Sequence, residues 1–185
     1  MAKSTQTVIA LLRGINVGGR NRLPMADLRS IGRDLGFGDP TTYLQSGNLV
    51  LFDVKLDTGE VSAALTDAIR RVVGLDIPII ARTASEWAAV IADNPFPGAT
   101  SDGTKLHVVF LDQPATERIR GFDSEPYRPE EFAVTESEVY LLLPNGIGRS
   151  KLATALTRVD NADQGTARNW NTVTGLFELI AGGPP

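Results

Sequence analysis

The order of apolar patterns along the first half of the chain limits its fold most strongly. An almost wholly apolar run at 7–12 is typical of a buried strand, and residues 25–35 then repeat apolar side chains at helical spacing. Two β-rich runs follow, Thr41–Gln45 and Asn48–Phe52, with Ser46-Gly47 between them as a two-residue hairpin signal. These patterns predict a strand, a helix and a hairpin in that order.

A second helix and a further strand complete this half. Asp57 and Glu60 have the spacing of a capping box before a helical stripe at 61–72. A strand over 77–82 follows, and its Pro78 favours the edge of a sheet. The order β-α-β-β-α-β predicts an α+β, ferredoxin-like fold for residues 1–93.

The second half repeats most of this order. Residues 94–104 are rich in Pro, Gly, Ser and Asp and form the expected boundary. After it we predict a βαββα half over residues 94–185, packed with the first half as one unit. Its predicted elements are a strand at 106–111, a helix at 114–120, a hairpin of 131–135 with 139–143, and a helix capped by Ser150. We expect a C-terminal helix, with Thr166 as its N-cap, in place of the last strand.

The segment between the first strand and the first helix, Arg13–Asn21, is the strongest candidate for a functional loop. Glycine allows positive φ angles and the close approach of a ligand to the backbone. Backbone N–H groups before a helix, together with arginine, are suited to binding an anion. The segment lacks the Gly-Lys-Ser/Thr of a phosphate-binding P-loop and the spacing of a dinucleotide fingerprint. A strained turn with a purely structural role is the alternative.

The predicted topology brings a second polar loop to this one. In a ferredoxin-like sheet the end of the first strand and the hairpin between the second and third strands share one rim, so Arg13–Asn21 should face Gln45–Asn48. Two convergent polar loops predict a ligand site. Its candidate residues are Arg13, Gly14, Asn16, Gly18, Gly19, Asn21, Gln45, Ser46 and Asn48. Alternatively, Gln45 and Asn48 only cap the hairpin.

Charge and composition narrow the choice of ligand. The chain carries a net charge of −4, whereas residues 1–33 contain six basic groups and one acidic group. A basic segment in an acidic protein favours a local anionic small molecule and argues against nucleic acid, which needs a broad basic face. With no cysteine and one histidine, His107 in a predicted strand, we expect no metal site. No cofactor is indicated.

The sequence also bears on location. The first six residues lack the apolar core of a signal peptide, and no run approaches the ~20 apolar residues of a membrane helix. We therefore expect a cytoplasmic protein without a membrane partner.

A second glycine and basic cluster lies in the other half. Gly148, Arg149 and Lys151 precede a predicted helix, and Arg168, Asn169 and Trp170 open the C-terminal helix. These residues could form a second wall of the site if the halves fold together. Trp170 could stack on a base or belong to the core. No general base is evident, because Asp27 lies within a helix, so enzyme activity stays open.

Four blocks of the sequence resemble a known family. They are Ile9–Gly19, Gln45–Asn48, Gly148–Leu152 and Arg168–Val173, and they are similar to the signature blocks of the bacterial family known as domain of unknown function 1697. The resemblance runs from about residue 8 to 180. It implies a two-part α+β chain with a ferredoxin-like first half, and it implies no activity and no residue roles.

Two other functions are compatible with this fold. In a protein-interaction or structural module, edge strand 77–82 would pair across a homodimer, and the loops would be scaffolding. An RNA-binding module is less well supported, because such plaits stack bases on aromatic residues of their central strands. Here the strand at 7–12 has no aromatic residue, and that at 48–52 has only Phe52.

Overall fold

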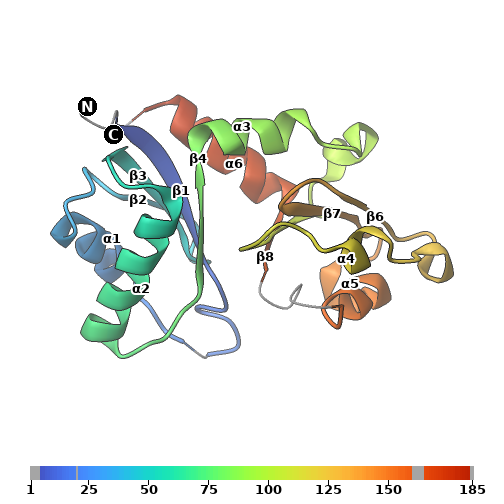
Figure 1. Ribbon diagram of the computed structural model, residues 1–185, viewed down its shortest axis with the longest axis horizontal. Coiled ribbons are helices and arrows are strands. Elements are labelled where there is room, and N and C mark those ends of the chain that lie inside the picture. Colours follow the sequence, from blue (N-terminus) through green and yellow to red (C-terminus); the bar gives the residue numbers. More distant parts are fainter. Residues whose placement is uncertain (1–4, 20, 160–164, 184–185) are drawn as a thin grey trace. The chain divides into compact units, whose positions relative to one another are not determined.

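The computed structural model describes residues 5–19, 21–159 and 165–183. The chain divides into two compact units. The first unit contains residues 1–89 and 176–185, and the second contains residues 90–175. Figure 1 shows the elements of both units along the chain.

The first unit has the predicted ferredoxin-like topology. Its elements are β1 (Gln6–Leu12), α1 (Met25–Asp34), β2 (Thr41–Tyr43), β3 (Asn48–Val54), α2 (Thr58–Val73) and β4 (Ile79–Thr83), followed by α3 (Ala84–Ala92), which continues into the second unit. The strands form one sheet in the order β2-β3-β1-β4, with every neighbouring pair antiparallel. The prediction of βαββαβ for this half is therefore confirmed, and β4 lies at an edge as Pro78 suggested.

One face of this sheet is covered by α1 and α2 (Figure 1). Alternate residues of β1, Val8, Ala10 and Leu12, join a buried cluster with Leu28 of α1 and Leu65 of α2. Burying large aliphatic side chains in this way contributes about 1.5–3 kcal/mol for each one. This core fixes where β1 ends, and so where the loop after it begins.

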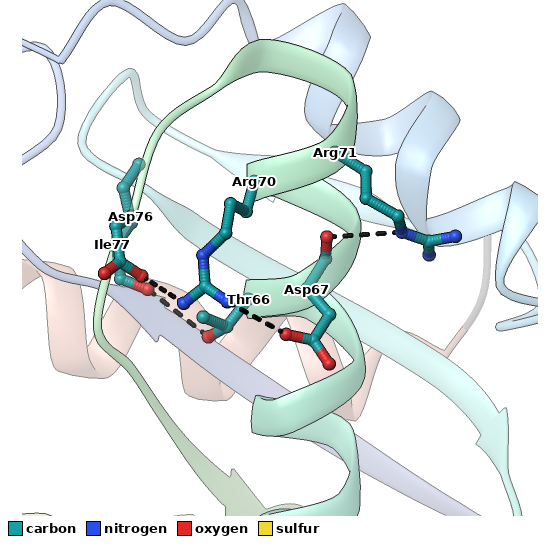
Figure 2. A network of polar contacts seen from close by, with 6 residues as sticks. All are labelled: Thr66, Asp67, Arg70, Arg71, Asp76 and Ile77. Carbon is teal, nitrogen blue, oxygen red and sulfur yellow. Dashed lines mark hydrogen bonds and ion pairs between the residues drawn. The ribbon is translucent and has the colours of Figure 1, made fainter.

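The end of α2 is tied to the start of β4 (Figure 2). Arg70 donates to Asp76 over 2.6 Å, and the hydroxyl of Thr66 donates to the carbonyl of Ile77 over 3.3 Å. The hydrogen bond and charge of Asp76 raise the pKa of Arg70. The capping box of Asp57 and Glu60 holds the other end of α2, as predicted. The contacts to Asp76 and Ile77 hold the segment that enters β4, which lies beside the end of β1 because the N–H of Arg13 donates to the carbonyl of Pro78.

The turn between β2 and β3 is longer than predicted. Tyr43 pairs with Asn48, so the turn spans four residues, Leu44 to Gly47, and Gln45 is not in the strand. Leu44 and Gly47 both have positive φ, 59° and 76°. The expected two-residue turn at Ser46-Gly47 was wrong, because the left-handed conformation at Leu44 ends the strand earlier than side-chain pattern alone indicates.

The second unit forms another four-stranded antiparallel sheet. Its elements are β5 (Leu106–Phe110), α4 (Glu117–Arg120), β6 (Glu131–Val134), β7 (Glu138–Leu142), α5 (Lys151–Leu156), β8 (Thr166–Asn169) and α6 (Trp170–Ala181), with short 3₁₀ helices at Pro97–Asp102, Glu125–Tyr127 and Ile147–Arg149. The sheet order is β6-β7-β5-β8, and α6 continues into the first unit. The α+β class is confirmed for both units.

The last strand of the second unit corrects the sequence analysis. Residues 166–169 pair with β5 as strand β8, so no helix replaces the fourth strand. The C-terminal helix begins at Trp170, and its cap is Asn169, whose Oδ1 accepts from the N–H of Thr172 over 3.0 Å. Thr166 is therefore a strand residue. A strand of four residues is too short to show a period before the strong helical pattern that follows.

Candidate functional site

The candidate site lies at the rim of the first sheet where β1 ends. The N–H of Leu12 donates to the carbonyl of Gly47 over 2.8 Å, and the N–H of Arg13 donates to the carbonyl of Pro78 over 3.0 Å. Strand pairing thus continues past β1 toward the β2–β3 turn on one side and the start of β4 on the other. The convergence expected from the topology, between the loop after β1 and this turn, is present.

Asn16 connects the two loops. Its Nδ2 donates to the carbonyl of Gln45 over 2.9 Å and to the carbonyl of Leu23 over 3.0 Å. Its Oδ1 accepts from the N–H of Leu23 over 3.0 Å. The residue has a φ of 54°, a conformation that asparagine tolerates better than most residues do. The side chain of Asn16 therefore braces the loop from within.

The rest of this loop folds back on itself. The N–H of Asn16 donates to the carbonyl of Asn21 over 3.2 Å, and Nδ2 of Asn21 donates to the carbonyl of Gly14 over 3.1 Å. Between them Gly18 and Gly19 have φ values of 58° and 76°, the sign that a type I′ turn requires at both central positions. Positive φ values are easily adopted by glycine and costly for most other residues, which accounts for glycine at both positions. Arg20, which the sequence analysis included in this loop, lies outside the described residues.

The β2–β3 turn packs closely under the same loop. A Cβ at Gly47 would lie 2.8 Å from Cβ of Leu12 and 2.7 Å from Cδ1 of Ile15, so the turn needs glycine here. Asn48 is fully buried, and its Nδ2 donates to the carbonyl of Tyr43 and to Oγ of Ser46. Asn48 therefore holds the turn in place rather than presenting an atom to solvent.

The solvent-facing groups of the rim are both polar and apolar. Gln45 and Ser46 are exposed, and Arg13 is half-buried. Val17 and Leu44 are 66% and 55% exposed, and the pattern of the sequence did not single them out. A leucine in the left-handed region with its side chain largely in solvent carries strain that burial does not offset. Such strain is typical of positions kept for function.

The second predicted cluster lies within the second unit. Strands β7 and β8 both end beside the start of β5, since Leu142 pairs with Leu106 and Asn169 pairs with His107. The segment with Gly148, Arg149 and Lys151 follows β7 and so belongs to the same rim as Arg168, Asn169 and Trp170. The sheet of this unit therefore places the ends of β7 and β8 at one rim, with β5 between them.

The members of this cluster differ in accessibility. Arg149 and Lys151 are exposed, whereas Arg168 and Trp170 are buried. Burial lowers the pKa of Arg168 to about 10. Its Nη1 donates to Oγ1 of Thr166 and to the carbonyl of Ala167, each over 2.8 Å. Only Arg149 and Lys151 present a charge at the surface of this cluster.

The start of α5 is already occupied by a carboxylate of the chain. Glu130 is 8% exposed, and its Oε2 accepts from the N–H of Leu152 over 2.8 Å and from Oγ of Ser150 over 3.0 Å. Ser150 in turn caps the helix by accepting from the N–H of Ala153, as predicted. Glu130 was missed by the sequence analysis, because its partners lie 20 and 22 residues away along the chain.

His107 belongs to the packing of the second sheet. It is 7% exposed, and its Nδ1 is buried without a hydrogen-bond partner among the described residues. Burial lowers its pKa, so the imidazole is held neutral.

Residues 5–19, 21–159 and 165–183 contain no cluster of three or more metal-ligating side chains. None of the helices in these residues is long and apolar enough to cross a bilayer. The polar groups at the first rim are backbone amides, side-chain amides, a serine hydroxyl and arginine.

Comparison with known proteins identifies the family. Residues 5–140 match the model of a protein family of unknown function, DUF1697. The chain belongs to the DUF1697 family.

A solved structure also shares the fold of this DUF1697 chain. The conserved bacterial protein SP0830 from Streptococcus pneumoniae superposes with a TM-score of 0.71 at 20% sequence identity, over 96% of this chain and 99% of that one. At this identity the similarity concerns the fold alone. No curated protein matches the chain.

Proposed function

We propose that the rim of the first sheet binds an anionic small molecule that carries phosphate. The hydrogen bond between Asn16 and Gln45 is the observation that supports this most directly, because it joins two exposed loops that are distant in sequence. Arg13 would supply positive charge, and Gln45 and Ser46 would supply hydrogen-bonding groups. Backbone groups of Gly18 and Gly19, which are exposed, complete the set of contacts.

The predicted residues fall into two groups: those whose side chains hold the loops, and those proposed to contact the ligand. Asn16, Asn21 and Asn48 hold the two loops, as their side-chain amides donate to main-chain carbonyls. We propose that Arg13 and Gln45 contact the ligand. A rim held rigid before binding loses little conformational entropy when the ligand arrives, which favours affinity.

A thermal-shift screen against phosphate-bearing metabolites, nucleotides and inorganic pyrophosphate tests this proposal. A ligand at a hundred times its dissociation constant should stabilise the protein by about 2.7 kcal/mol, or roughly 5–10 °C at this length. Arg13→Ala should abolish the shift, and Arg13→Lys should keep part of it. Arg71→Ala is the matched control, since Arg71 is exposed on α2 and donates to a carbonyl of its own helix. A shift that survives Arg13→Ala would place the ligand elsewhere.

The alternative function is a protein-interaction module using the same rim. The exposed side chains of Val17 and Leu44 favour this alternative, because they flank the hydrogen-bonded pair Asn16 and Gln45. Substituting both with serine should then weaken binding to a partner protein and leave the response to small anions unchanged. If the screen gives no hit in the wild type, this alternative becomes the better account.

A further inference from the structure

A groove of about 320 Å³ lies along strand β6 of the second unit. It is lined by Arg120, Phe122, Phe132, Ala133 and Val134. Strand β6 is at one end of the sheet order and pairs with β7 alone among the described strands. The groove therefore runs beside a sheet edge whose outer backbone groups have no strand to pair with.

The register of the β6–β7 hairpin shows which backbone groups point outward. In an antiparallel pair, residues that exchange main-chain hydrogen bonds alternate with residues whose N–H and C=O point away from the partner strand. The N–H of Thr135 donates to the carbonyl of Glu138 over 2.9 Å, so this pair is hydrogen-bonded. It follows that Val134 and Phe132, one and three residues earlier, direct their backbone groups to the outer edge.

The side chains along the groove have two characters. Phe122 packs edge-to-face on Phe132, with ring centroids 6.0 Å apart and an interplanar angle of 77°. Arg120 lies beside the turn after β6, where its Nη2 donates to the carbonyl of Glu136 over 3.4 Å and its Nε donates to the carbonyl of Ala115 over 3.2 Å. A guanidinium has five donors, and within the described residues Arg120 forms no ion pair. An apolar site and a guanidinium without an ion-pair partner among the described residues thus lie at successive points along β6.

We propose that this groove binds an extended peptide, which adds to β6 as an antiparallel strand. Its backbone would pair with Phe132 and Val134. A peptide side chain opposite Phe132 would be apolar and pack on Phe122, and the one opposite Val134 would be a carboxylate facing Arg120. Side chains two residues apart lie on one face of a strand and about 7 Å apart, which suits both contacts. Strand addition with alternate side chains in pockets is an established mode of peptide recognition.

The test is a binding titration on the full chain followed by fluorescence anisotropy. The probe is a fluorescein-labelled peptide, Ser-Thr-Glu-Thr-Leu-Thr-Ser, in which glutamate precedes leucine as antiparallel pairing with β6 requires, and its control has glutamine in place of glutamate. Losing a charge-assisted hydrogen bond should weaken binding about tenfold or more. Arg120→Gln should weaken binding of the glutamate peptide by a similar factor and remove the preference for glutamate over glutamine. Equal binding of both peptides to the wild type would overturn the role of Arg120.

Backbone pairing is tested on the peptide itself, so that folding of the protein is not affected. Methylating the leucine nitrogen should abolish binding, because that N–H faces β6. Methylating the nitrogen of the threonine between leucine and glutamate should preserve binding, because that N–H points away. Equal binding of both methylated peptides, or no saturable binding of the parent peptide at millimolar concentration, would overturn the proposal. A concentration-dependent dimer that is lost in Val134→Pro would also overturn it, by assigning the edge to a second copy of the chain.

Discussion

The side-chain amide of Asn16 donates a 2.9 Å hydrogen bond to the main-chain carbonyl of Gln45, 29 residues further along the chain. The same side chain both donates to and accepts from Leu23. One asparagine thus joins the loop after β1 to the turn between β2 and β3. At the first rim the two loops are held together by this contact.

Replacing Asn16 should destabilise the protein. Asn16→Ala removes all three side-chain hydrogen bonds and places a less tolerant residue at positive φ, so we expect a loss of about 1–3 kcal/mol in the free energy of unfolding. Asn16→Gly, which keeps the backbone freedom, should lose less. Urea denaturation measures both, with the exposed Asn145→Ala as control. A change below 0.5 kcal/mol for Asn16→Ala, within the usual range of surface substitutions, would contradict the bracing role.

Leu44 should prove costly to stability. Leucine in the left-handed region costs roughly 1–2 kcal/mol relative to its preferred conformations, whereas asparagine adopts it more readily. Since the Leu44 side chain is 55% exposed, Leu44→Asn should raise the free energy of unfolding by up to about 1 kcal/mol. The midpoint of urea unfolding measures this. A clear loss of stability would show that the leucine side chain stabilises the fold after all.

Acid should weaken the second unit through His107. Burial lowers the pKa of His107 in the folded state, so the unfolded chain binds a proton more readily. The stability from the neutral imidazole is complete above the unfolded pKa of about 6.5 and is lost as pH falls through the folded value. Denaturation between pH 7 and 4.5 should therefore show a steeper decline for the wild type than for His107→Leu.

A second group, Asp102, affects stability at pH values below that range. The hydrogen bond from Thr104 and that from Lys105 lower the pKa of Asp102, so its contribution is lost at still lower pH than an ordinary aspartate's. If the wild type and His107→Leu lose stability equally between pH 7 and 4.5, His107 is not the source of the acid sensitivity in that range.

Glu130 should be important for α5. Glu130→Ala leaves the N–H of Leu152 and the hydroxyl of Ser150 without their acceptor, and we expect a loss of about 2–3 kcal/mol. Glu130→Gln retains an oxygen that can accept both hydrogen bonds and should lose less. Chemical denaturation distinguishes the two variants. If Glu130→Gln and Glu130→Ala lower the free energy of unfolding equally, α5 requires the negative charge of Glu130 rather than its hydrogen bonds.

Local sequence patterns predicted most of the fold. The capping box of Asp57 and Glu60 marked the start of α2, and the apolar run at 7–12 marked the central strand β1. Both signals depend on residues within a few positions of each other. Strand β8 was missed because four residues are too few to show a strand period. The turn at Leu44 was misplaced because leucine rarely adopts the positive φ that it has here.

The site was predictable only in outline. Topology placed the loop at Arg13 beside the turn at Gln45, because the order of elements determines which strand ends share a rim. The internal bracing by Asn16 and Asn48 could not be derived, since it depends on side-chain directions across strands. Exposure of Val17 and Leu44 likewise follows from loop conformation, which apolar residue type does not reveal.

The proposed rim is tested most directly by an NMR titration of the ¹⁵N-labelled protein with inorganic pyrophosphate. We predict saturable shifts of the backbone amides of Gly18, Gly19 and Gln45, together with neighbours in the two loops, and their disappearance in Arg13→Ala but not in Arg71→Ala. Saturable shifts confined to other residues, or shifts at the rim that persist in Arg13→Ala, would contradict the proposed site.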